Sequence, residues 1–226
     1  MRFFCFAFFF TILTSVSAMA SEAQKTYVVI GDSIMSLVGD GQSKDHALTL
    51  VASERDVMFK NISSPGASLG GVPPFGFNSA LVTSELTSLL GVLDYFDGII
   101  VQAGVNDFSG NMPWSTNAES LNRILDYARA HNKKVLMLDL LWMWNEANPN
   151  STGWILLNYR IARSMVCASY PDVCVFAPRP AEFDRPSTTL FAAADVDAGK
   201  QLHPNAIGHR IYANWLASVA ASAGLF

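Results

Sequence analysis

Residues 27–35 read Tyr-Val-Val-Ile-Gly-Asp-Ser-Ile-Met, and this stretch decides how the rest of the chain is interpreted. Four consecutive apolar residues that end at Gly31 predict a short strand buried on both faces, which is typical of parallel sheets. Asp32 and Ser33 follow directly, so we expect a tight turn that leads from the strand into a helix. A serine in such a turn lies at the edge of the sheet, and its backbone N–H lies near a helix N-terminus that favours negative charge.

The same alternation of strands and helices continues along the chain. Further apolar runs predict strands, and segments with apolar residues at helical spacing predict helices. The expected strands are residues 27–30, 57–59, 98–101, 134–141 and 173–176, and the expected helices are 45–55, 79–93, 118–130, 154–169 and 206–221. This order predicts an α/β fold, a three-layer sandwich around a central parallel sheet of about five strands. Residues 178–201 show neither pattern, and we expect a long loop there, which in a compact domain is often functional.

Four residues stand where a parallel sheet presents its ligand site, beyond the carboxyl ends of the strands. Ser33 follows the first expected strand, Gly66 the second and Asn106 the third. His203 precedes Pro204, which suits the first turn of the last helix. Each residue alone also has a structural explanation: a helix cap, a Pro-Gly turn, a turn residue and a solvated histidine.

Taken together, these blocks resemble those of the SGNH (GDSL) hydrolases. The matching blocks are Gly-Asp-Ser at 31–33, glycine at 66, Gly-Val-Asn-Asp at 104–107 and His-Pro-Asn at 203–205. The resemblance implies a flavodoxin-like SGNH hydrolase fold and a serine esterase without a cofactor. It implies that Ser33 is the nucleophile and His203 the general base. It also implies an oxyanion hole made of the backbone N–H groups of Ser33 and Gly66 and the side chain of Asn106.

The residue that orients the histidine departs from the family pattern. The family has an aspartate three residues before the histidine, and here that position is Lys200, whose ammonium group has only donors. We expect Asp197 to orient His203 instead, because the following Ala198-Gly199 pair allows the loop to bulge. Asp195 and a loop carbonyl are the alternatives.

Other catalytic motifs are weaker. Residues 66–70 read Gly-Ala-Ser-Leu-Gly and match the nucleophile elbow of α/β-hydrolases, with Ser68 as the serine. That motif needs a strand before it and a helix directly after it. Here Pro65 precedes it and Gly-Val-Pro-Pro follows at 71–74, which favours a loop. No metal-ligand spacing joins the four histidines, and no phosphate-binding loop is present, so we expect neither a metal nor a cofactor.

The N-terminal 20 residues resemble a secretory signal peptide. Arg2 supplies a positive start, an apolar run follows from Phe3 to Leu13, and small-residue cleavage sites end at Ala18 and Ala20. The apolar run is too short to cross a bilayer as a helix. We therefore expect residues 1–20 to be removed, and residues 21–226 to form one hydrolase domain that is secreted or periplasmic.

Charge and cysteine content fit that expectation. The formal net charge is −4 and no basic run exists, so nucleic acid is a poor candidate as a partner. Cys167 and Cys174 are the two cysteines outside the N-terminal segment. In an oxidising compartment such a pair is expected to form a disulfide, with two buried thiols as the alternative.

The predicted activity is hydrolysis of ester bonds through an acyl-enzyme, on a small-molecule or carbohydrate ester. Export, together with Trp114, Trp142 and Trp144 near the expected site, favours short acyl esters of carbohydrates, although these tryptophans also suit a core. An O-acyltransferase that uses a sugar acceptor, a lipid or lysophospholipid esterase and a non-catalytic binding module are the alternatives.

Overall fold

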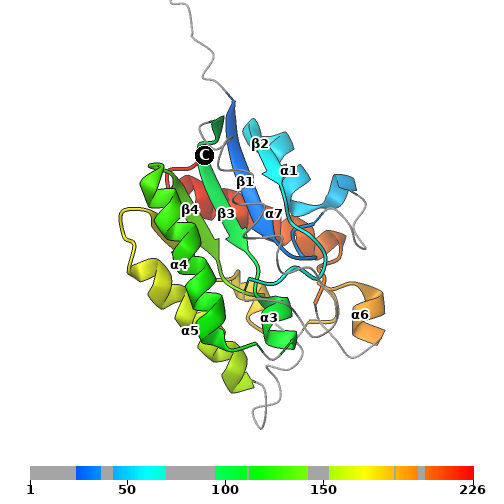
Figure 1. Cartoon of the computed structure of the whole chain (residues 1–226). Coiled ribbons are helices and arrows are strands. Elements are labelled where there is room, and N and C mark those ends of the chain that lie inside the picture. Colours follow the sequence, from blue (N-terminus) through cyan, green and yellow to red (C-terminus); the bar gives the residue numbers. More distant parts are fainter. Residues whose placement is uncertain are drawn as a thin grey trace, which may run out of the picture.

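The computed structural model describes residues 24–36, 43–69, 95–110, 112–141, 153–185, 187–197 and 202–226. Its centre is a parallel sheet of five strands in the order β2-β1-β3-β4-β5 (Figure 1). The strands are β1 (Lys25–Gly31), β2 (Val57–Asn61), β3 (Gly98–Gln102), β4 (Lys134–Leu138) and β5 (Cys174–Ala177). The predicted α/β architecture is confirmed, and β1 lies between β2 and β3, where the strand order reverses.

Helices cover both faces of the sheet (Figure 1). One face packs against α1 (Ala47–Arg55) and α7 (Ala206–Ser222), and the other against α4 (Trp114–Ala130) and α5 (Gly153–Ala168). The short helices α3 (Val105–Ser109) and α6 (Ala193–Asp197) lie beyond the carboxyl ends of the strands, and η1 (Ser43–Asp45) and η4 (Ala181–Phe183) are single 3-10 turns. The molecule is therefore a three-layer sandwich.

The apolar run of β1 is buried from both sides. Tyr27 and Val29 pack in the core beneath α1 and α7, and Val28 and Ile30 pack in the core beneath α4. Successive side chains of a strand point to opposite faces, so a strand between two helical layers has no polar face. This is the physical reason for the unbroken apolar run at the start of the fold.

Several predicted elements have different limits in the structure, and the helix expected over 118–130 begins at Trp114. The strand expected over 134–141 ends at Leu138, and just after it the Asp139 carboxylate accepts a hydrogen bond from the Leu140 N–H at 2.9 Å. The segment expected to be irregular contains α6. The helix expected over 79–93 and the proposed signal peptide lie outside the described residues.

Within the part of the chain that the structure describes, no helix is long and apolar enough to span a membrane.

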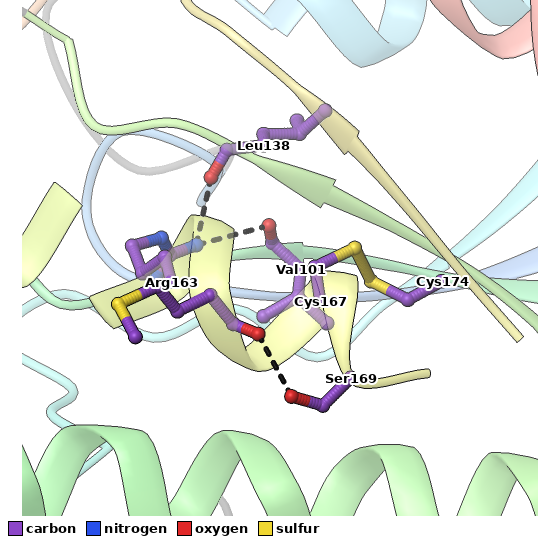
Figure 2. Close-up of a disulfide and its surroundings, with 7 residues drawn as sticks. Val101, Leu138, Arg163, Cys167, Ser169 and Cys174 are labelled. Atoms are coloured by element: carbon purple, nitrogen blue, oxygen red, sulfur yellow. Dashed lines mark hydrogen bonds between the residues drawn. A yellow bond between two sulfur atoms is a disulfide. The ribbon is translucent and has the colours of Figure 1, made fainter. Parts of the chain in front are cut away.

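The predicted disulfide is present. Cys167 near the end of α5 is bonded to Cys174 at the start of β5, and their Cα atoms lie 5.3 Å apart (Figure 2). Both cysteines are buried in the core beneath α4. The bridge therefore closes the short turn between a helix and the edge strand that follows it.

Two buried histidines join α1 to α7. His46 caps α1, and its Nδ1 accepts a hydrogen bond from the Leu48 N–H, so Nε2 carries the proton and donates to the Ile34 carbonyl. The His209 ring on α7 packs against the His46 ring with centroids 4.6 Å apart. Burial lowers the pKa of His46, and burial followed by repulsion from His46 and His203 lowers the pKa of His209 to about 3. Both rings are therefore neutral in the folded protein near neutral pH.

We predict that replacing Cys167 and Cys174 together with alanine lowers the free energy of unfolding by about 2–3 kcal/mol, because the bridge restricts the unfolded chain. Urea denaturation of the variant and of the wild type measures the difference. In the unreduced wild-type protein, mass spectrometry should find no alkylatable thiol at these two positions.

We also predict an acid-sensitive stability that depends on His209. As the pH falls below about 6.5, the unfolded chain binds a proton at His209 that the folded chain excludes, so the free energy of unfolding falls. One excluded proton gives a slope of about 1.4 kcal/mol per pH unit. His209→Gln should reduce the slope between about pH 4 and pH 6.5 by up to this amount. His131→Gln, at the half-exposed end of α4, is the matched control, and an unchanged slope in His209→Gln contradicts the prediction.

Candidate active site

Ser33 lies in a tight turn directly after β1. The Asp32 carbonyl accepts hydrogen bonds from the N–H groups of Met35 at 3.2 Å and Ser36 at 2.9 Å, and the Asp32 side chain accepts from the Ile34 N–H at 3.0 Å. These bonds close one helical turn around Ser33. The serine is partly exposed, while its neighbours Asp32 and Ile34 are buried. The local sequence therefore fixes the turn and leaves the hydroxyl of Ser33 accessible at the sheet edge.

His203 reaches Ser33 from the other end of the chain. Its Nε2 lies 2.8 Å from the Ser33 Oγ, although 170 residues separate them in the sequence. The imidazole side chain is 29% exposed, so it borders solvent on one side and the serine on the other. An imidazole that accepts from a serine hydroxyl is arranged to take its proton.

The carboxylate beside His203 belongs to Asp195, not to Asp197. One Asp195 Oδ2 atom lies 2.9 Å from His203 Nδ1 and accepts the His203 backbone N–H at 2.7 Å. Asp195 and Asp197 are both in α6, where successive residues are rotated by about 100° around the axis, so side chains two positions apart point in nearly opposite directions. Asp197 is exposed. The structure therefore places Asp195, the alternative, and not the expected Asp197, in contact with His203. Lys200 lies outside the described residues.

A short antiparallel bridge holds Asp195 and His203 together. Ala192 N–H donates to the His203 carbonyl at 2.8 Å, and Asn205 N–H donates to the Leu190 carbonyl at 2.9 Å. The Asn205 side chain adds a donation to the Phe191 carbonyl at 3.0 Å. Because these bonds fix both segments, α6 starts immediately beside the histidine. The contact between Asp195 and the imidazole is thus a consequence of the bridge.

Gly66 and Asn106 belong to two further segments at this edge. Gly66 has a φ of 76°, a left-handed conformation that favours glycine over residues with a Cβ. Asn106, in α3, donates from Nδ2 to the carbonyl of Ala67 at 2.9 Å, which ties α3 to the loop that contains Gly66. The amide nitrogen of asparagine carries two hydrogens. One hydrogen remains for another acceptor after this bond.

Ser68 lies at the centre of the alternative nucleophile motif. It is fully buried, and the segment from Ile62 to Leu69 consists of turns and loop, without the strand that a nucleophile elbow requires directly before its serine. The Leu69 N–H donates to the Asp107 carboxylate at 2.9 Å. The segment therefore serves as a packed loop beneath the site.

Asp32 introduces a buried carboxyl group next to the serine. Burial raises its pKa to about 7, and the negative charge of Asp107 adds to this rise, while the Ile34 N–H and the Arg163 guanidinium oppose it. Asp32 is thus surrounded by both signs of charge. The first-strand motif points to this residue, but nothing in the sequence indicates that its partners come from α3 and α5.

Sequence reasoning missed two further residues of this region, His46 and Arg163. His46 bonds to the carbonyl of Ile34, one residue after Ser33, and Arg163 is a fully buried cation. A lone histidine just before a helix and a lone arginine within a helix carry no local signal of such contacts. Among the described residues, no cluster of three or more histidine, cysteine or acidic side chains has the arrangement of a metal site.

Several solved structures are similar to this chain in fold. A psychrotrophic esterase from Pseudoalteromonas sp. is 15% identical, with a TM-score of 0.67 over 88% of this chain and 98% of the esterase. A salicylyl-acyltransferase from a tetracycline biosynthetic pathway is 16% identical, with a TM-score of 0.68 over 91% of this chain and 56% of that protein. An acetylxylan esterase from Geobacillus stearothermophilus is 14% identical, with a TM-score of 0.64 over 86% of this chain and 93% of that protein. At these identities, the likeness establishes the fold.

Comparison of the sequence itself gives the family. No curated protein matches the chain significantly. The model of the GDSL-like lipase/acylhydrolase family matches residues 29–211, a region that contains Ser33, Asn106 and His203. This match covers most of the sequence, and the chain therefore belongs to the GDSL-like lipase/acylhydrolase family.

Proposed function

We propose that the protein is a serine ester hydrolase in which Ser33 is the nucleophile, His203 the general base and Asp195 the residue that orients the histidine. The observation that carries the proposal is the continuous chain of contacts from Ser33 Oγ to His203 Nε2 at 2.8 Å and from His203 Nδ1 to Asp195 Oδ2 at 2.9 Å. A serine, an imidazole and a carboxylate in this order form the arrangement that activates a hydroxyl nucleophile. Family membership supports the same assignment.

Acylation follows from this arrangement. The Ser33 Oγ attacks the ester carbonyl carbon while His203 Nε2 takes its proton. Asp195 keeps the proton on Nδ1, so that the lone pair of Nε2 faces the serine, and its negative charge stabilises the imidazolium that forms. The imidazolium then gives its proton to the leaving alcohol as the carbon–oxygen bond of the ester breaks. The product of this half-reaction is an acyl group bound to Ser33.

The oxyanion of the tetrahedral intermediate needs preorganised donors. Our candidates are the backbone N–H groups of Ser33 and Gly66 and the second amide hydrogen of Asn106. The bond from Asn106 to the carbonyl of Ala67 supports this role, because it fixes the amide group beside the loop of Gly66 before any substrate binds. Loss of one such donor typically lowers kcat by about 10²–10³-fold.

Deacylation decides between hydrolysis and acyl transfer. Water activated by His203 releases the acid, whereas a sugar hydroxyl bound in the same position accepts the acyl group. A salicylyl-acyltransferase shares this fold, which makes transfer the second candidate function. Product analysis with and without a sugar acceptor separates the two outcomes, because only transfer yields an acylated sugar.

The favoured substrates are short acyl esters, with carbohydrate esters as the first class to test. Helix α4 begins on the side of the molecule where the strands end (Figure 1). Its first residue is Trp114, whose side chain is exposed, and an exposed indole can stack on a sugar ring. The acetylxylan esterase of the same fold is a further support. Trp142 and Trp144 lie outside the described residues.

We also propose that the protein is secreted or periplasmic after removal of residues 1–20. The disulfide supports this location because such bonds persist in oxidising compartments.

We predict that Ser33→Ala reduces the hydrolysis of aryl acetates to a residual level, because the variant has no nucleophile. Ser68→Ala is the matched control and should keep most of the activity. A serine-directed phosphonate should label the peptide that contains Ser33.

A series of aryl esters with increasing acyl length, assayed on the same wild-type protein, should show the highest kcat/KM for short chains. Label on Ser68, or a clear preference for long chains, overturns the corresponding assignment.

We predict that Asp195→Asn lowers kcat by about 10²–10⁴-fold with little change in KM, because the imidazole loses the acceptor that fixes its tautomer. Asp197→Asn replaces an exposed carboxylate two residues away and should keep a near-normal kcat. Steady-state kinetics of the two variants, with circular dichroism to verify their folding, make the comparison. The opposite order of the two effects would show that the contact seen here is not the one used in catalysis.

A further inference from the structure

Arg163 is a fully buried cation in α5 that serves the carboxyl ends of two strands. Its Nη1 donates to the Ala103 carbonyl at 2.5 Å, and its Nη2 donates to the Leu138 carbonyl at 2.7 Å, with a longer contact to Val101 at 3.5 Å. Figure 2 shows the guanidinium facing the carbonyls of Leu138 and Val101, close to the disulfide. Leu138 is the last residue of β4, and Ala103 follows the last residue of β3. One planar side chain therefore joins two strand ends.

The guanidinium also lies against the turn that carries Asn106. Gly104 follows Ala103 and has a φ of 129°, a conformation that residues with a Cβ rarely adopt. A Cβ at Gly104 would stand 3.4 Å from Arg163 Nη1 and 3.1 Å from the Asn117 side chain. The Gly104 carbonyl accepts the Phe108 N–H at 3.2 Å and so begins α3. Asn106 is the second residue of α3, three positions from the carbonyl that Arg163 holds.

Carboxylates around the guanidinium belong to the other loops of the site. Burial lowers the pKa of Arg163, and the nearby Asp139, Asp107 and Asp32 oppose that effect. Asp32 forms the turn of Ser33, and Asp107 accepts the Leu69 N–H at the end of the Gly66 loop. The cation thus stands beneath the segments that carry the proposed donors.

A buried charge at this position needs a reason. Taking a guanidinium out of water costs several kcal/mol, and well-packed apolar residues often give equal or greater stability than a buried ion pair. Stability alone therefore does not explain the presence of Arg163. Its planar fork holds donors to the carbonyls of two strand ends in a fixed geometry, whereas an ammonium is a compact charge on a flexible stem and an apolar side chain has no donor.

We propose that Arg163 is a positioning residue for the oxyanion site: by holding the Ala103 carbonyl it fixes the turn that presents the Asn106 amide. The inference rests on the proposed function, because it assigns Arg163 an effect that reaches the substrate only through Asn106. A displacement of about 1 Å in a catalytic group is enough to lower the rate about 10²-fold. The effect should therefore appear in kcat rather than in KM.

A double-mutant cycle tests this coupling. The four proteins are the wild type, Arg163→Met, Asn106→Ala and the double variant, all assayed with an aryl acetate. Arg163→Met should lower kcat about 10- to 100-fold in the wild-type background. In the Asn106→Ala background the same change should lower kcat by less than about threefold, because the group that Arg163 positions is already absent. A second cycle uses Arg163→Lys in place of Arg163→Met and so retains the positive charge. This second cycle decides the question if Arg163→Met does not fold.

The matched control is Arg160→Met. Arg160 is one helical turn earlier in α5 and forms a bidentate pair with the Asp139 carboxylate, whereas the bonds to the carbonyls at the end of β3 come from Arg163. Its loss should leave kcat nearly unchanged and should not depend on Asn106. The inference is overturned if Arg163→Met, or Arg163→Lys in its place, lowers kcat by the same factor in the wild type and in Asn106→Ala. This outcome leaves the proposed function intact as long as hydrolysis depends on Ser33. Hydrolysis that survives Ser33→Ala overturns the proposed function itself.

Discussion

The backbone ladder that joins β1 to both β2 and β3 is the constraint on which the site depends. Val29 pairs with Asn61 on one side and with Ile100 on the other, and Gly31 pairs with Gln102. The loop after β2 continues this pairing, since the Ser64 N–H donates to the Gly31 carbonyl at 3.2 Å. Three strand ends are therefore level with one another at the point where the strand order reverses. Ligands of open parallel sheets bind at such a point.

The base and its partner reach this edge by a different route. Neither is on a strand of the sheet, and both depend on the antiparallel bridge between Phe191 and Pro204. The bridge sets where α6 begins, and the start of α6 sets which carboxylate faces His203. Asp195 therefore takes the proposed role of orienting His203, which the family pattern of an aspartate three residues before the histidine would assign to position 200. The same geometric task is achieved with an aspartate eight residues before the histidine.

Ionisable side chains are buried beneath the site, in a place where apolar side chains would give a more stable core. Burial raises the pKa of Asp32 to about 7 next to the proposed nucleophile, and Arg163 lies fully enclosed between strand ends. Such groups cost free energy unless they are paired and hydrogen-bonded. Their position, directly below the loops that carry Ser33 and Asn106, is consistent with a selection for geometry over stability. The disulfide ties the end of the same helix, one turn after Arg163, to β5.

The sequence by itself determined the layers of the fold, the positions of Ser33, Gly66, Asn106 and His203 at one edge, and the cysteine pair. Each follows from a local pattern: apolar runs predict buried strands, and in a parallel sheet all residues that follow strands share an edge. Only the tertiary structure decided that Asp195 and not Asp197 faces His203. The spacing along the chain gives distance but not direction, and in a helix two residues of separation turn a side chain to the opposite side. It also decided that Arg163 lies under Asn106, because contacts between elements 60 residues apart arise from packing and leave no periodic signal in the sequence.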